Sequence, residues 1–110
     1  MITNIDVTDF TPTSERIGST ITIFAPPQEV PPNSLRVLNA MFYPVAEGQR
    51  HQRPATAHII DHEKYTKLSI QPSKYLEGGK QYCFIISLVN EQTGDKYNFR
   101  SPAGKHFNLL

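Results

Sequence analysis

The sequence lacks tryptophan and has a single cysteine, Cys83. One thiol excludes an intramolecular disulfide, and it also excludes a structural zinc site that needs two or more thiolates. We therefore expect side-chain packing to stabilise the folded chain.

Long apolar runs are also missing. No stretch approaches the roughly 18 apolar residues that a membrane-spanning helix needs, and the opening residues, MITNIDVTDF, contain neither a basic nor an apolar segment. These absences predict a chain without a signal peptide or a membrane anchor. We interpret it as a complete short gene product.

An excess of charge of either sign is absent too. Eleven Lys and Arg face ten Asp and Glu, which gives a formal net charge of +1. No general electrostatic attraction to nucleic acid is expected from this balance. With 38% hydrophobic and 19% charged residues over 110 positions, the composition is typical of one globular domain spanning residues 1–110.

Alternation of polar and apolar residues is the dominant pattern along the sequence, and this pattern predicts strands. The strongest run spans residues 81–90, and its predicted inward set is Tyr82, Phe84, Ile86 and Leu88. Further strands are predicted at 5–10, 20–24, 35–43, 55–60, 66–71, around 97–99 and at 105–110. Only residues 61–68 have a pattern compatible with a helical turn or two.

The predicted strand at 35–43 is apolar on both faces. Simple alternation divides its side chains into one set with Val37, Met41 and Tyr43 and another with Leu38, Ala40 and Phe42. Seven or eight short strands at a spacing of roughly ten residues are typical of a β-sandwich or a small barrel. The sequence therefore predicts an all-β domain.

A short motif precedes the strongest strand. Leu76, Gly79 and Tyr82 are spaced as in the Leu-x-Pro-Gly-x-x-Tyr turn of fibronectin-III and bacterial immunoglobulin-like domains, with Gly78 at the proline position. The segment from 76 to 90 resembles the turn and penultimate strand of those families. The resemblance implies a Greek-key immunoglobulin-like sandwich, in which the Tyr82 hydroxyl bonds back to the main chain at the turn. A jelly-roll-like sandwich is the alternative architecture.

Catalytic and cofactor motifs are not found. The sequence contains no Gly-x-Ser-x-Gly, phosphate-binding loop or dinucleotide fingerprint. Cys83 is predicted to be a small core hydrophobe, since it lies in the strongest strand. We therefore expect neither an enzyme nor a cofactor.

Histidines and carboxylates gather between residues 51 and 63. His51, His58 and His62, with Asp61 and Glu63, are ligand types that could hold a metal ion. Their spacing matches no recognised site, so we interpret them as surface residues at a strand end and predict no metal site.

The most distinctive polar segment spans residues 48–53. It carries Arg50, His51 and Arg53 without an intervening acid, in a loop between two predicted strands. Guanidinium groups suit carboxylates and phosphates, and loops of a rigid sandwich often carry binding residues. This loop is the predicted contact site for a partner.

Domains of the resembled type commonly serve as adhesive spacers or as accessory domains of bacteriophage particles. The resemblance and the missing export signal together favour a virion decoration or accessory protein that contacts larger capsid or tail subunits, or copies of itself. The expected location is the virion, reached through the host cytoplasm, or the cytoplasm itself. One alternative is a carbohydrate-binding module that stacks sugars on Tyr43, Tyr65, Tyr75 or Tyr97. The other is a small intracellular inhibitor or regulator of one enzyme.

Overall fold

The fold is all-β, as the sequence predicts. A computed structural model describes residues 2–26, 34–61, 66–72, 76–102 and 104–110. Strands make up 62% of these residues, and no α-helix occurs among them. A short 3-10 helix, η2, spans Gln49–His51. The described strands are β1 (Ile2–Asp6), β2 (Asp9–Thr11), β3 (Ser14–Glu15), β4 (Ile21–Ala25), β5 (Leu35–Pro44), β6 (Arg53–Asp61), β7 (Thr66–Gln71), β8 (Gln81–Asn90), β9 (Lys96–Arg100) and β10 (Phe107–Leu109).

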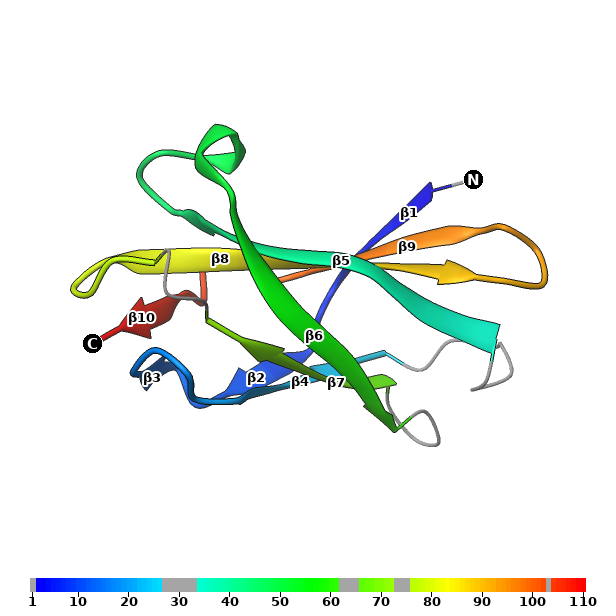
Figure 1. The fold of residues 1–110 in the computed structure, drawn as a ribbon, viewed down its shortest axis with the longest axis horizontal. Helices are drawn as coiled ribbons and strands as arrows, with labels where there is room; N and C mark the ends of the chain where they lie inside the picture. The colour runs from blue at the N-terminus through cyan, green and yellow to red at the C-terminus, as the bar shows by residue number, and fades with distance from the viewer. Residues whose placement is uncertain (1, 27–33, 62–65, 73–75, 103) are drawn as a thin grey trace.

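The strands form one curled sheet in the order β1-β9-β8-β5-β6-β7-β4-β2, with β10 pairing with both β8 and β3. Most pairs are antiparallel, whereas β1 runs parallel to β9 and β10 parallel to β3. β6 joins the two halves of the sheet, because its first residues pair with β5 and its later residues pair with β7. Figure 1 shows β6 crossing from the layer that contains β5 and β8 to the layer that contains β4 and β7.

The described strands number ten, so the predicted count of seven or eight is wrong. One of the two additional strands is β3, which the sequence does not predict, and the other results from a break in the expected N-terminal strand at Val7 and Thr8. The Val7 amide donates to the Arg100 carbonyl at 2.9 Å, and the Thr8 amide donates to the Phe24 carbonyl at 2.7 Å. The chain thus passes from one half of the sheet to the other between two consecutive residues, which divides one predicted strand into β1 and β2.

The core lies between the two halves, and β8 supplies its centre. Its bounds, Gln81–Asn90, are those predicted, and the predicted inward set is buried. Phe84 packs edge-on against Phe10 of β2 at 5.2 Å and against Phe42 of β5 at 6.3 Å between ring centroids. Aromatic rings from both halves therefore meet around one side chain, which ties the halves together.

The faces predicted for β5 are wrong over its first half. The β5–β8 register shifts between Val37 and Asn39. Val37 consequently packs against the core together with the buried Ala40 and Phe42, while Leu38 is 40% exposed. A bulge adds one residue and reverses the facing of every residue on one side of it, so alternation alone assigns these residues to the wrong faces.

The helical turn suggested for 61–68 is not supported by the residues described there. Asp61 closes β6, and Thr66 opens β7, which spans Thr66–Gln71 as predicted. Residues 62–65 lie outside the described part of the chain.

Candidate functional site

The loop between β5 and β6 is held to the body of the sheet by main-chain hydrogen bonds. The amides of Glu47 and Gly48 donate to the Pro44 carbonyl at 3.1 and 2.9 Å. The Val45 amide donates to the Gln81 carbonyl of β8 at 3.0 Å. Main-chain hydrogen bonds therefore hold the start of the loop both internally and to a core strand, and this fixes its position.

The three predicted contact residues lie in or just after η2, but their side chains differ in solvent exposure. Arg50 and His51 are exposed, whereas Arg53 is half-buried at the start of β6. The Arg53 Nη1 atom donates to the carbonyls of His51 and Gln52 at 3.0 and 3.2 Å. The Arg53 guanidinium thus stabilises the end of the loop through its own main chain. Among the described residues, Arg50 forms no ion pair, so its guanidinium is available to a partner.

The turn before β8 contains the three motif residues. Leu76 and Tyr82 are buried, and Gly79 has a φ of +81°, a conformation that favours glycine. The Glu77 amide donates to the Tyr82 hydroxyl at 2.8 Å. The Gly79 amide donates to the Leu109 carbonyl of β10 at 2.7 Å. The turn is therefore anchored to the start of β8 and to the last strand.

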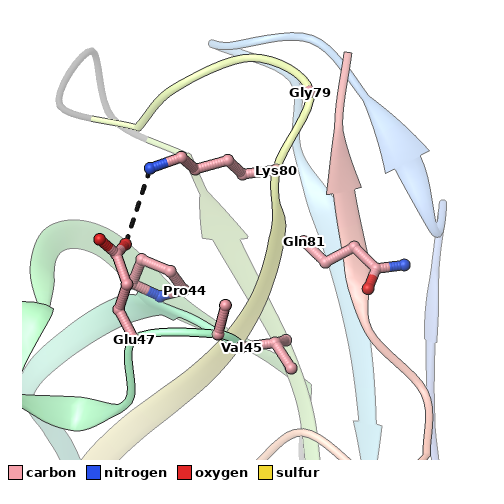
Figure 2. A pocket seen from close by; sticks show the side chains of 7 residues that line it. Pro44, Val45, Glu47, Gly79, Lys80 and Gln81 are labelled. Carbon is pink, nitrogen blue, oxygen red and sulfur yellow. Dashed lines mark ion pairs between the residues drawn. The ribbon is translucent and has the colours of Figure 1, made fainter.

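A pocket of about 590 Å³ lies between this turn and the β5–β6 loop. Its lining residues are Pro44, Val45, Ala46, Glu47, Gly79, Lys80 and Gln81. Figure 2 shows the side chains of Glu47 and Lys80 pointing toward one another beside Pro44. Pro44, Val45 and Ala46 give the lining an apolar part, and Glu47 and Lys80 add charge beside it, an arrangement that suits a ligand with an apolar stem and a polar head.

Electrostatics at this pocket centre on Lys80. Its Nζ atom lies 3.0 Å from a Glu77 carboxylate oxygen and 3.6 Å from a Glu47 carboxylate oxygen. The Glu77 hydrogen bond raises the pKa of Lys80 above its usual value, and the charge of Glu47 adds to the rise. Two carboxylates and one ammonium give this group of residues a net negative charge.

Sequence reasoning missed Glu47 and Lys80. They lie more than thirty positions apart, and only the pairing of β5 with β8 brings their segments together. The turn motif identifies the segment around Lys80, but no local pattern points to Glu47.

Cys83 does not occupy the predicted core position. Its side chain is half-buried on the outward-facing side of β8, and its Sγ atom lies 3.6 Å from His106 Nδ1. The neighbouring inward residues Tyr82 and Phe84 are buried, so the strand is central as predicted while its cysteine faces outward. Strand alternation is the physical reason, since successive side chains point to opposite faces.

This position predicts a reactive thiol. Iodoacetamide should alkylate Cys83 in the folded protein without denaturant, because the residue is partly exposed and faces away from the core. Mass spectrometry of the intact protein measures the adduct, and circular dichroism recorded before and after alkylation confirms that the fold persists. Labelling that begins only in denaturant would contradict the outward placement.

Among the other candidate residues, the structure describes His51, His58 and Tyr97. His51 and His58 are exposed, while His62 and Glu63 lie outside the described residues, as do Tyr65 and Tyr75. Tyr97 packs against the core and stacks on Phe99 at 6.5 Å between ring centroids, so part of its ring is covered. Within the described ranges, no three His, Cys, Asp or Glu side chains form a metal-binding group.

No helix in the described segments is both long and apolar enough to cross a membrane. In the comparisons with known proteins, no family model, curated protein or solved structure matches the chain.

Proposed function

We propose that the chain is a non-catalytic binding module with an immunoglobulin-like Greek-key fold, and that its β5–β6 loop contacts an acidic surface of a partner protein. The observation that carries the proposal is the loop itself. It presents the exposed Arg50 guanidinium from a backbone that is already tied to β8. Preorganised loops lose little conformational entropy on binding.

The strand connections support the immunoglobulin-like assignment. The chain passes from β4 in one half of the sheet to β5 in the other, and from β7 back to β8. The hydrogen bond between the Glu77 amide and the Tyr82 hydroxyl fits the tyrosine corner of those domains.

Arg50 is the residue to test. Replacing it with glutamate is expected to weaken binding to the partner that co-purifies with the chain about tenfold, because the change turns an attraction to an acidic surface into repulsion. Biolayer interferometry on the captured partner measures the change. Lys96→Glu is the matched control, because it makes the same charge change at the β8–β9 end of the molecule, away from the loop (Figure 1). Equal affinities for the Arg50→Glu variant and the unmodified chain would refute the proposed contact.

For the biological setting, we propose a virion decoration or accessory protein that contacts capsid or tail subunits. The chain should then co-sediment with assembled capsids or tails encoded by the same genome. A coding sequence without neighbouring virion genes, or a chain that stays behind when such particles sediment, would contradict this setting.

A further inference from the structure

We propose that the pocket between the β5–β6 loop and the turn before β8 accepts an aliphatic cation, the side chain of a lysine or arginine on the partner protein. This inference deepens the proposed function and rests on it, because it names the chemistry that the partner presents beside the Arg50 contact. Its three supports are the charge of the pocket, its apolar wall and its rigidity.

The charge of the pocket selects a cation. Glu47 and Lys80 line the pocket, and Glu77, which is outside the lining, pairs with the Lys80 ammonium, so the three groups together carry one excess negative charge. The raised pKa of Lys80, caused first by its hydrogen bond to Glu77 and then by the charge of Glu47, reflects the same negative surroundings. A positively charged group is therefore favoured over a negative one.

The two carboxylates are not equally engaged with Lys80. The Nζ atom is within hydrogen-bonding distance of Glu77 at 3.0 Å, whereas its 3.6 Å separation from Glu47 is too long for a hydrogen bond. Glu47 also lines the pocket directly. The Glu47 carboxylate is therefore the group that can accept hydrogen bonds from a new ammonium or guanidinium.

The apolar part of the lining, which directly precedes Glu47 in the chain, suits the stem of such a side chain. Pro44, Val45 and Ala46 follow one another along the pocket, and Val45 is 39% exposed although it is a large apolar residue. Lysine and arginine cover apolar surface with their methylene groups while the charged head stays near water. A cationic side chain lying along this wall would bring its head to Glu47.

Both sides of the pocket are fixed by main-chain hydrogen bonds. The Val45 amide donates to the Gln81 carbonyl, and the Gly79 amide donates to the Leu109 carbonyl. The pocket thus exists before binding, so a small probe of the same chemistry should occupy it without the rest of the partner.

The test is a titration of the ¹⁵N-labelled full chain with N-acetyl-lysine amide, followed by amide NMR shifts. Shifts are expected at Ala46, Gly79 and Gln81, with a dissociation constant in the roughly millimolar range that is usual for one exposed ion pair and one short apolar stem. N-acetyl-norleucine amide keeps the apolar stem but lacks the charge, so it should bind more weakly. N-acetyl-glutamate amide should not bind.

Two variants should change the affinity for the lysine probe in opposite directions. Glu47→Gln should weaken binding roughly three- to fivefold, because it removes the acceptor charge, and Lys80→Gln should strengthen it by a similar factor, because it removes the competing cation. Glu91→Gln is the matched control, since Glu91 forms its ion pair with Arg36 outside this pocket. Amide spectra of the free variants show whether each one remains folded.

The inference is overturned if the norleucine and lysine probes bind equally, if the glutamate probe is preferred, or if none of the pocket amides shifts. It is also overturned if Glu47→Gln and Lys80→Gln change the affinity in the same direction. Failure of the proposed function is a separate result. In that case the lysine probe still binds, whereas Arg50→Glu leaves partner affinity unchanged.

Discussion

Replacing Phe84 with alanine is expected to lower the free energy of unfolding by about 3 to 5 kcal/mol. Phe84 is fully buried at the centre of β8, and it contacts aromatic rings from both halves of the sheet. Truncation removes the buried ring and leaves a cavity that its neighbours can fill only in part. Since a domain of this size is stable by roughly 5 to 15 kcal/mol, the loss is a large part of the total.

Urea denaturation followed by circular dichroism measures the Phe84 effect. Cys83→Ala is the matched control from the adjacent, outward-facing position, and it should cost less than about 1 kcal/mol. If Phe84→Ala fails to fold, Phe84→Leu provides a milder test, with an expected loss of about 1 to 1.5 kcal/mol. Equal losses at positions 83 and 84 would mean that β8 does not face the core as described.

The second large effect is expected at Tyr82. Tyr82→Phe should lower the free energy of unfolding by about 1 to 2 kcal/mol, because the Glu77 amide loses the hydroxyl that accepts its hydrogen bond at 2.8 Å. The aromatic ring remains, so its packing against Phe42 is retained. The loss therefore measures the contribution of the hydroxyl to the turn before β8.

Thermal and chemical denaturation both report the Tyr82 effect. Tyr97→Phe serves as the control and should change stability by less than about 0.5 kcal/mol, because among the described residues Tyr97 makes a ring contact with Phe99 but no hydrogen bond through its hydroxyl. Similar losses in the two variants would show that the Tyr82 hydroxyl does not stabilise the turn.

Several elements could be predicted because their signals are local. β7 and β8 have the predicted bounds, and β8 buries the predicted inward set. In both strands the period-two pattern depends only on neighbouring residues, and a strand with one buried face shows that pattern directly. The motif before β8 likewise pointed to the turn, where Gly79 adopts the positive φ.

The predictions of strand faces and strand bounds are wrong where hydrogen bonds between distant segments interrupt the simple alternation of side chains. The β5 bulge places Leu38 outside and Val37 inside, although simple alternation predicts neither. The N-terminal strand divides after Val7, because the Val7 amide bonds to Arg100 in one half of the sheet whereas the Thr8 amide bonds to Phe24 in the other. The prediction for Cys83 is wrong for another reason: β8 is central, but alternate side chains point to opposite faces, and the face that carries Cys83 is only half-buried at this position.

The sequence by itself determined the all-β class, the central strand and the turn that precedes it, because alternation and glycine conformation act over a few residues. Tertiary structure alone decided the bulge in β5, the passage of β6 between the two halves of the sheet and the pocket beside Glu47 and Lys80. These features depend on hydrogen bonds and charges between residues that are distant in the chain. Such contacts exist only once the sheet has curled and closed around its core.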